Sequence, residues 1–213
     1  MRSPPAPSSP ARQDEDATAA AVLDAAAACF ARFGPRKTTM EDVARTAGCS
    51  RATVYAHFRG KDALYAALLD RITRGFVREV EACLAEEADP RATLRRIVEI
   101  ARRTYAGSPV RLAAATGDDA MRLAHVAAEA MRRHEEQVVA LLTRVVRQGV
   151  ASGVMRAVDP RMAAYLMYQL GNALVIREVS GRGDFPFPRI LDAMDDLIDH
   201  GLAAPRGRRR SAR

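Results

Sequence analysis

Four side chains between positions 51 and 61 bring basic, hydroxyl and imidazole groups into one short stretch: Arg51, Tyr55, His57 and Lys61. An arginine side chain can reach a guanine edge or a phosphate oxygen. A phenol, an imidazole and an ammonium group suit contacts to phosphates. Several of the residues between them are small, so a helix that carries them can lie close to base edges. The stretch therefore predicts contacts to nucleic acid.

Capping residues place this stretch on the second of two short helices. Thr39 can cap a first helix, and Asp42 follows it by three residues, as in a capping box. Gly48 lies where the chain leaves that helix through a positive φ angle, which glycine adopts at little cost. Ser50 can cap the second helix, and Val54 turns inward to hold it against the first. The spacing predicts a helix–turn–helix corner, which places its second helix in the major groove of DNA.

The charge of the chain is compatible with such a partner. The 213 residues carry a formal net charge of +7, and the sequence pI is about 9.9. Within residues 17–61, seven basic side chains stand against three acidic ones, a net charge of +4. Charge alone permits nucleic acid without specifying it. Two helices joined at a glycine also occur in helical bundles that bind no nucleic acid. The prediction of nucleic-acid binding therefore rests on the corner and its positive charge together.

The stretch from Thr38 to Leu64 resembles the DNA-binding domain of the TetR (tetracycline-repressor-like) family. The resemblance covers about residues 17–76 and includes the Tyr-x-His-Phe-x-x-Lys run that ends at Lys61. It implies DNA contacts at these positions: Lys37, Thr39, Ser50, Arg51, Ala52, Thr53, Tyr55, His57 and Lys61. Cys49 and Ala56 depart from the residues more common in the family, which leaves the base preference open.

Between two polar ends, the sequence predicts an all-α protein of about nine helices. Residues 1–16 and 205–213 cannot bury apolar surface, so we expect a disordered N-terminal arm and a basic, disordered C-terminal tail. We expect a three-helix DNA-binding domain of the helix–turn–helix type over residues 17–76. The remainder, residues 77–204, is expected to form a helical ligand-binding and dimerisation domain.

Apolar spacing and helix-ending signals locate the individual helices. Apolar residues recur at helical spacing from Val22 to Phe33, and Gly34-Pro35 then ends the first helix. A long helix is predicted to begin near Lys61, with an apolar stripe that runs to Val80. Three later helix starts carry a capping residue before a proline, at Asp89-Pro90, Ser108-Pro109 and Asp159-Pro160.

The last two predicted helices differ in pattern. Residues 162–179 are apolar nearly all round, so several sides of that helix must be covered. The next helix has one apolar stripe from Ile190 to Ile198, and we expect the acids opposite it to be solvated. Such a pair suits a four-helix interface across a two-fold axis, which is how the resembled family dimerises. A homodimer would present two recognition helices to a palindromic operator in double-stranded DNA, about 34–36 Å apart.

The segment 77–204 is larger than a tether requires, and methionine and tyrosine residues form adaptable surfaces for apolar molecules. The candidate ligand-binding residues are Ile100, Arg103, Met121, His125, Gln169 and Asn172. Further candidate walls are Ile97, Tyr105, Met131, Met155 and Met162. Taken singly, each apolar candidate is more typical of ordinary core. Gln169 and Asn172 suit either a ligand anchor or a pair across the dimer interface, and both interpretations stay open.

These observations predict a ligand-responsive DNA-binding transcriptional regulator, most simply a repressor that a small-molecule inducer releases from its operator. The alternative is a ligand-independent regulator or architectural protein whose C-terminal domain only dimerises. An enzyme finds no support, because the sequence holds no GxSxG, HExxH or glycine-rich phosphate loop. No catalytic residue, cofactor or metal is therefore expected.

The cysteines and the hydropathy pattern indicate the compartment. Cys29, Cys49 and Cys83 are widely spaced and form no CxxC pair, which favours reduced thiols in a cytoplasmic protein. The N-terminus is rich in proline and serine and lacks the apolar core of a signal peptide. We also expect no apolar run of about 18 residues, the length of a membrane span. The prediction is a cytoplasmic protein without a membrane partner.

Overall fold

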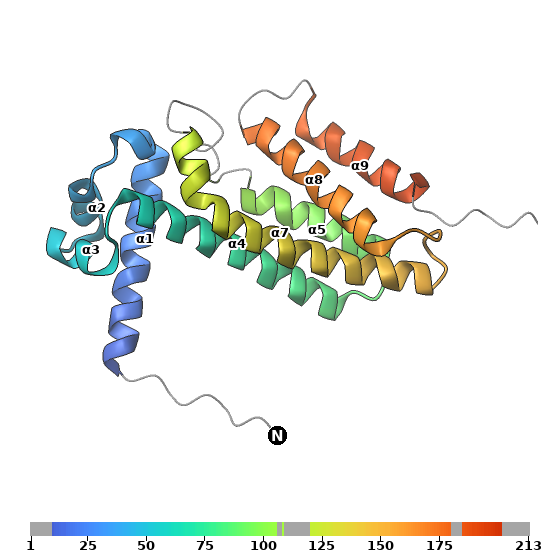
Figure 1. Cartoon of the computed structure of the whole chain (residues 1–213), viewed down its shortest axis with the longest axis horizontal. Coiled ribbons are helices and arrows are strands. Elements are labelled where there is room, and N and C mark those ends of the chain that lie inside the picture. The colour runs from blue at the N-terminus through green and yellow to red at the C-terminus, as the bar shows by residue number, and fades with distance from the viewer. Residues whose placement is uncertain (1–9, 106–107, 109–119, 180–184, 202–213) are drawn as a thin grey trace, which may run out of the picture.

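The structure, a computed structural model, describes residues 10–105, 108, 120–179 and 185–201. Within these ranges it contains helices and no β-strand, so the prediction of an all-α fold is confirmed (Figure 1). The helices are α1 (Pro10–Lys37), α2 (Met40–Ala47), α3 (Arg51–His57), α4 (Lys61–Glu86), α5 (Pro90–Tyr105), α7 (Ala120–Ala151), α8 (Pro160–Val179) and α9 (Phe187–Gly201). The helix expected after Ser108-Pro109 and the basic tail at 205–213 lie outside the described residues.

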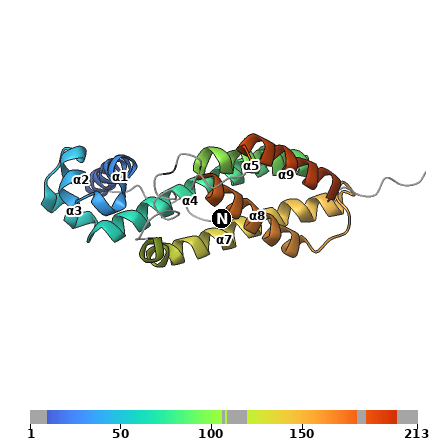
Figure 2. The ribbon, with the colours of Figure 1, turned by 90° about the horizontal axis from the view of Figure 1, so that it is seen from above.

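Helices α1, α2 and α3 pack together with the first half of α4 at one end of an elongated molecule (Figures 1 and 2). Their core is apolar and fully covered. Its buried residues include Val22, Ala26, Phe30, Val43, Ala44, Val54, Leu64, Tyr65 and Leu68. Ala44 is small at the point where α2 approaches its neighbours, and Val54 is completely buried, as the sequence pattern predicts.

Helix α1 begins earlier than the sequence pattern indicates. It starts at Pro10, inside the segment 1–16 that we expected to be a disordered arm. A proline suits the first turn of a helix, where its missing N–H costs nothing. The residues from 14 to 17 are exposed, so this part of α1 is helical without burying apolar surface. In Figure 1 it extends away from the other helices.

The end of α1 matches the predicted stop at Gly34-Pro35, with one difference. Gly34 has φ 76° and interrupts the helical backbone before the final turn to Lys37. The hydroxyl of the buried Thr38 then donates to the carbonyl of Gly34 at 2.8 Å. Phe33, expected on the inward stripe, is instead 43% exposed, with the Arg32 guanidinium 5.0 Å from its ring centroid. Phe33 continues the apolar face of α1 beyond the edge of the small core.

Helices α4 and α7 lie side by side and take part in two cores (Figures 1 and 2). Leu64 and Leu68 of α4 belong to the first core, whereas Phe76 of the same helix belongs to the second. Ala127 and Ala130 of α7 are buried in the first core, and the later turns of α7 line the second. The expected domain boundary at residue 76 therefore falls inside a continuous helix.

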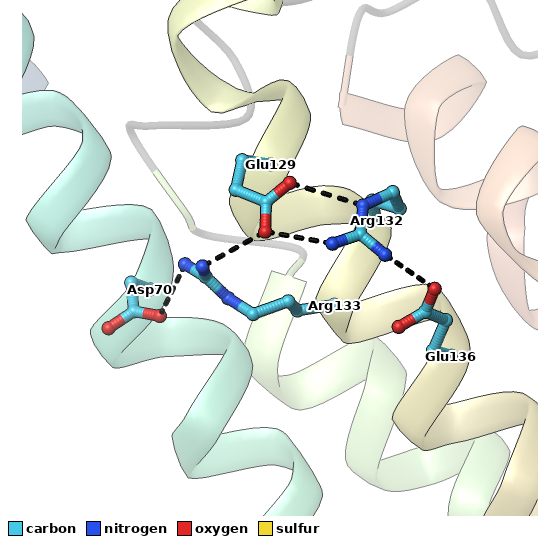
Figure 3. A network of polar contacts seen from close by, with 5 residues as sticks. All are labelled: Asp70, Glu129, Arg132, Arg133 and Glu136. Atoms are coloured by element: carbon cyan, nitrogen blue, oxygen red, sulfur yellow. Dashed lines mark hydrogen bonds and ion pairs between the residues drawn. The ribbon is translucent and has the colours of Figure 1, made fainter.

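A network of ion pairs joins the outer surfaces of α4 and α7 (Figure 3). Arg133 of α7 lies 3.7 Å from the Asp70 carboxylate of α4 and 3.2 Å from that of Glu129. Arg132 bridges Glu129 at 2.9 Å and Glu136 at 2.6 Å. The hydrogen bond from Arg132 is the main reason that the pKa of Glu129 is lowered. Within this network, only the Arg133–Asp70 pair joins the two helices, and exposed pairs of this kind contribute little stability singly.

The second core lies between α4, α5, α7 and α8. Two predicted caps set its helix starts. Asp89 accepts a hydrogen bond from the backbone N–H of Arg91 at 3.1 Å, one residue after Pro90 opens α5. Asp159 accepts from the N–H groups of Arg161 at 2.8 Å and Met162 at 3.0 Å at the start of α8. Helix α9 packs against α5 (Figure 2).

One described helix differs from the hydropathy expectation. The segment from Asp14 to Lys37 is long and apolar enough, by length and composition, to cross a membrane. We expected no such run, and the hydropathy of the segment comes largely from its alanines. One helix of this kind is weak evidence, since core helices of soluble proteins pass the same test. Here Val22, Ala26 and Phe30 of the segment form the first core.

Candidate nucleic-acid interface and ligand cavity

The predicted corner is present in full between α2 and α3. The Thr39 hydroxyl accepts from the Asp42 N–H at 3.1 Å, and the Asp42 carboxylate accepts from the Thr39 N–H at 3.0 Å. These bonds from Thr39, followed by the charge of Arg45, lower the pKa of Asp42. Gly48 ends α2 in the left-handed region at φ 68°. Ser50 accepts from the backbone N–H of Thr53 at 3.0 Å and opens α3.

The outer face of α3 is exposed and basic. Arg51, Ala52 and Tyr55 are all exposed, and the Arg51 guanidinium carbon lies 5.4 Å from the centroid of the Tyr55 ring. A planar guanidinium over an aromatic face is an attractive cation–π arrangement that narrows the range of arginine conformations. His57 is half-buried at the end of the helix. The face thus presents small residues flanked by one oriented arginine and one phenol.

Four of the expected contact residues also hold the corner together. The Thr39 hydroxyl bonds to the Asp42 carboxylate in the cap of α2, and the hydroxyls of Ser50 and Thr53 bond to each other in the cap of α3. The Lys61 ammonium donates to the carbonyls of Pro35 at 3.1 Å and Arg36 at 3.0 Å. Lys61 therefore joins the start of α4 to the end of α1. Lys37, by contrast, is exposed beside this junction.

A shallow hollow lies between the starts of α2 and α4 and the side of α3. Its walls include Thr39, Arg51, Tyr55, Arg59 and Lys61. Gly60 precedes α4 and offers no side-chain cap to the N–H groups of the first turn. Uncapped N–H groups at a helix N-terminus and nearby cations favour an anion. The hollow is therefore suited to a backbone phosphate next to the exposed face of α3.

A second, apolar cavity of about 470 Å³ lies within the helical body at the other end of the molecule. Residues of α4, α5, α7, α8 and α9 line it, together with the loop before α8. Most of its walls are aliphatic, from Leu94 and Ile97 on α5 to Val138 and Leu142 on α7. The volume and the apolar lining are typical of small-molecule sites.

The six candidate ligand residues do not lie together, and of those whose side chains the structure describes only Asn172 lines the cavity. Asn172 lines the cavity, and with Tyr168 it also lines a hollow on the α7 side of α8. Gln169 donates to the Glu135 carboxylate at 3.3 Å and is not among the lining residues. Ile100 is buried in the second core. Arg103 pairs with Glu79 on the outer surface, and His125 is exposed. The side chain of Met121 lies outside the described residues.

The further candidate walls also divide. Ile97, Tyr105 and Met162 line the cavity. Met155 is buried in the second core, with its sulfur close to Gly149. Met131 packs against the first core and lines the hollow on the α7 side of α8.

Sequence reasoning missed one buried polar group of the cavity lining. His134 of α7 is only 3% exposed, and its Nε2 lies 2.9 Å from the Tyr105 hydroxyl of α5. Rings of Phe76, Tyr105 and Tyr168 surround this imidazole, with centroids 5.5 to 6.0 Å from its own. The signal available in the sequence was a histidine on the apolar face of α7, one turn before Val138. Its partners lie on α4, α5 and α8, and no local sequence pattern indicates that these helices meet at His134.

The described residues contain no group of three or more His, Cys, Asp or Glu side chains placed to hold a metal ion. Cys29 and Cys83 are buried and Cys49 is half-buried, and all three are free thiols. Burial raises the pKa of the Cys83 thiol.

Comparison with known proteins agrees with the corner and with the helical body. The model for bacterial regulatory proteins of the tetR family matches residues 22–68. A model described as the tetracyclin repressor-like C-terminal domain matches residues 87–176. The chain belongs to the TetR family. The family resemblance stated from the sequence is thereby confirmed, and it extends beyond the DNA-binding region into the C-terminal body.

Two curated relatives of higher sequence identity match the chain over part of its length. MT1294 of Mycobacterium tuberculosis, an uncharacterized HTH-type transcriptional regulator, is 39% identical over 69 residues, which are 32% of this chain and 34% of the relative. The HTH-type transcriptional repressor KstR2 of Rhodococcus jostii is 37% identical over 81 residues, 36% of this chain and 38% of the relative. The chain thus spans about a third of the length of these curated relatives.

Solved structures share the fold over most of the chain. The transcriptional regulator FadR of Bacillus subtilis, solved in complex with stearoyl-CoA, matches with a TM-score of 0.67 over 85% of this chain and 98% of that chain. The two sequences are 18% identical, so the likeness concerns the fold.

Proposed function

We propose that this protein is a cytoplasmic, homodimeric repressor that binds a palindromic operator and is released by a small-molecule inducer. The observation that carries the proposal is the position of α4. Its first half forms part of the core under α3, and Phe76 on its second half lines the apolar cavity. A molecule in the cavity thus contacts the helix against which the DNA-binding corner packs. FadR, solved with stearoyl-CoA, offers a family precedent for a bound small molecule.

The inducer acts through its different affinities for two arrangements of α4. A ligand shifts an equilibrium only by the difference between its binding free energies for the two states. Displacement of α4 would change the spacing of the two recognition helices in a dimer, and DNA fixes that spacing at about one helical turn. Release of the operator then follows from lost geometric fit, without any change in α3 itself.

Uncovered apolar surface on α8 supports a homodimer. Met162, Leu166 and Leu170 lie on one face of this helix and are 57%, 59% and 44% exposed. Leu197 of α9 is also exposed, and all four of these side chains line the apolar cavity as well, so the cavity opens toward this surface. Contiguous exposed apolar residues on a soluble protein mark an interaction surface. A second copy related by a two-fold axis presents the same surface and can bury both.

Selection of bound fragments from the source genome tests the DNA-binding part. We expect the protein to enrich a palindromic sequence, and the double substitution Arg51→Ala with Tyr55→Ala to weaken binding of that sequence at least tenfold in a gel-shift assay. Arg147→Ala, on an exposed turn of α7 far from the corner, is the matched control. Operator affinity that survives the double substitution would disprove the assigned interface.

The alternative is a regulator whose C-terminal body only dimerises. The two proposals differ in the role of the cavity. Ala163→Trp would place an indole into the lining of α8 without touching the corner. Under the proposed function, this variant binds the operator but no longer responds to compounds that release the wild type. If no compound from a broad library stabilises the protein in thermal shift or releases the operator, the ligand-independent alternative holds.

A further inference from the structure

The apolar cavity is elongated along α8. The part of α8 that lines it begins at Met162 in the first turn and ends at Leu174. At a rise of 1.5 Å per residue, this stretch of helix is about 18 Å long. Aliphatic side chains dominate the opposite walls, among them Leu94 of α5 and Val138 and Leu142 of α7. The length and the lining of the cavity therefore suit a long apolar group.

Three charged side chains occur among the described lining residues: Arg102, Arg156 and Asp159. Two of them have strong partners. Arg102 donates to the Glu99 carboxylate at 2.9 Å, and the Asp159 carboxylate accepts from two backbone N–H groups at the start of α8. Arg156 differs, because its hydrogen bond goes to a neutral carbonyl. Its positive charge is therefore available to an anion.

The guanidinium of Arg156 also has free donors. Arg156 lies on the loop before α8, and its Nε donates to the carbonyl of Gly201, the last residue of α9, at 2.7 Å. A guanidinium carries five N–H donors in a planar fork, so the bond from Nε leaves the four N–H groups of the two terminal nitrogens. The described part of the chain offers these four no acceptor. A carboxylate matches them, because its two oxygens can accept two parallel N–H bonds.

A second arginine adds positive charge to the same loop. Arg91 of α5 donates through Nη2 to the Val154 carbonyl at 3.1 Å, and its buried Nε has no hydrogen-bond partner among the described residues. Within the described ranges, neither Arg91 nor Arg156 forms an ion pair with a carboxylate. With Asp159 as the one acid of the cavity lining there, this end of the cavity is positive and attracts an anion.

The position of Arg156 suits the charged end of an otherwise apolar molecule. Arg156 is exposed, so an anion bound to it stays partly hydrated. Such a position avoids the large desolvation cost of burying a charge completely. The apolar part of the same molecule can lie along α8 inside the cavity, where burial of apolar surface stabilises it.

We propose that the cavity binds an elongated apolar molecule that ends in a carboxylate, with the carboxylate on Arg156 and the apolar chain along α8. This inference rests on the proposed function, because it gives a chemical class to the ligand of the same cavity. Phe76 of α4 is part of the cavity wall, so a chain that fills the cavity contacts the helix against which the DNA-binding corner packs.

Three probes with the same alkyl chain test the charged end group. They are decanoate, 1-decanol and decylammonium, each titrated at pH 7 by calorimetry into the full-length protein. We expect decanoate to bind roughly 5-fold tighter than 1-decanol, the upper value for an exposed ion pair. Decylammonium should bind more weakly than 1-decanol, because the arginines repel it. The affinity of 1-decanol measures what the alkyl chain contributes without a charge.

Substitutions at Arg156 then assign the carboxylate site. Arg156→Gln removes the charge and keeps an amide donor, so the advantage of decanoate over 1-decanol should disappear while 1-decanol binds as before. Unchanged binding of 1-decanol shows that the cavity stays folded. Arg156→Glu reverses the charge, and decylammonium should then bind tighter than decanoate. Arg161→Gln is the matched control, since Arg161 is exposed in the first turn of α8 outside the lining and should leave the preference intact.

The outcomes separate this inference from the proposed function. If decanoate binds no tighter than 1-decanol, the class is wrong, while a ligand-binding cavity remains. If decanoate keeps its advantage in Arg156→Gln, the assignment to Arg156 is wrong. If none of the three probes binds, the inference fails, and a library screen for operator release decides separately whether the proposed function fails with it. If decanoate binds through Arg156 but leaves the operator bound, the inference stands and the proposed release is contradicted for this ligand class.

Discussion

At the scale of single residues, Lys61 serves the fold as well as the proposed interface. Its ammonium group donates to two carbonyls at the end of α1, and it borders the hollow suited to a phosphate. We expect Lys61→Met to lower the free energy of unfolding by about 1–2 kcal/mol and to weaken operator binding. Lys37→Met, at an exposed position, should weaken binding without a change in stability. Urea unfolding and gel-shift titration of both variants distinguish the structural role of Lys61 from its role in DNA binding. Equal free energies of unfolding for Lys61→Met and the wild type would contradict the structural role.

The capping box of α2 gives stability a predictable pH dependence. The pKa of Asp42 is lowered in the folded protein, mainly by its hydrogen bonds with Thr39. A lowered folded pKa means that the contribution is present above the unfolded pKa, near 3.9, and is lost as pH falls through the folded value. We therefore expect Asp42→Asn to destabilise the protein at pH 7 and to have a much smaller effect near pH 2.

Denaturant unfolding at several pH values measures that difference. Asp192→Asn, at an exposed position on α9, is the control and should leave stability unchanged at each pH. A difference between Asp42→Asn and wild type that stays constant down to pH 2 would show that the carboxylate does not carry the effect.

The same scale shows where sequence reasoning about the ligand site reached its limit. The sequence pattern indicates Arg103 and His125 as polar anchors, whereas the structure lines the cavity with Arg102, one position earlier, and with His134, nine positions later. Neighbouring residues on a helix point about 100° apart, so the difference of one position between Arg102 and Arg103 separates a cavity side chain from a surface one. The contact between His134 and Tyr105 spans 29 positions and two helices. No local pattern encodes such a contact.

At the scale of elements, the corner was predictable because its signals are local. The caps at Thr39 and Ser50 and the turn at Gly48 each act within three or four residues, and all three appear in the structure. The start of α1 was not predictable in the same way. Its first turns bury nothing, so the apolar periodicity that indicates a helix is missing there although the helix forms.

Two glycines, one at the end of α2 and one inside α4, should respond to substitution by alanine in opposite directions. Gly48 ends α2 at φ 68°, where a Cβ atom adds about 1–2 kcal/mol of strain. Gly75 lies inside α4 with open space around it, and alanine there should stabilise by up to about 1 kcal/mol. Thermal unfolding of Gly48→Ala and Gly75→Ala measures both. A stabilising effect of alanine at Gly48 would contradict the assigned turn.

At the scale of the whole molecule, the apolar face of α8 determines the proposed assembly. Light scattering should give the wild type twice the 23.2 kDa mass of one chain. Leu166→Glu places a charge at the centre of this face and should yield a folded monomer with weaker operator binding. Ala140→Glu, on an exposed turn of α7, should leave the mass unchanged. Dimeric Leu166→Glu protein would require a different interface.

The two alanines that α7 contributes to the first core limit how this protein can be divided. Ala127 and Ala130 lie more than fifty residues after the corner in the chain, yet they are buried in the core that the corner shares with α1 and α4. A fragment cut after α4 would expose the apolar patch that these alanines cover. A chimeric regulator that contains the DNA-binding domain of this protein therefore has to include the part of α7 that carries these two alanines as well. For the same reason, heating should melt the intact chain in one cooperative transition, because neither core is complete without helices that also build the other.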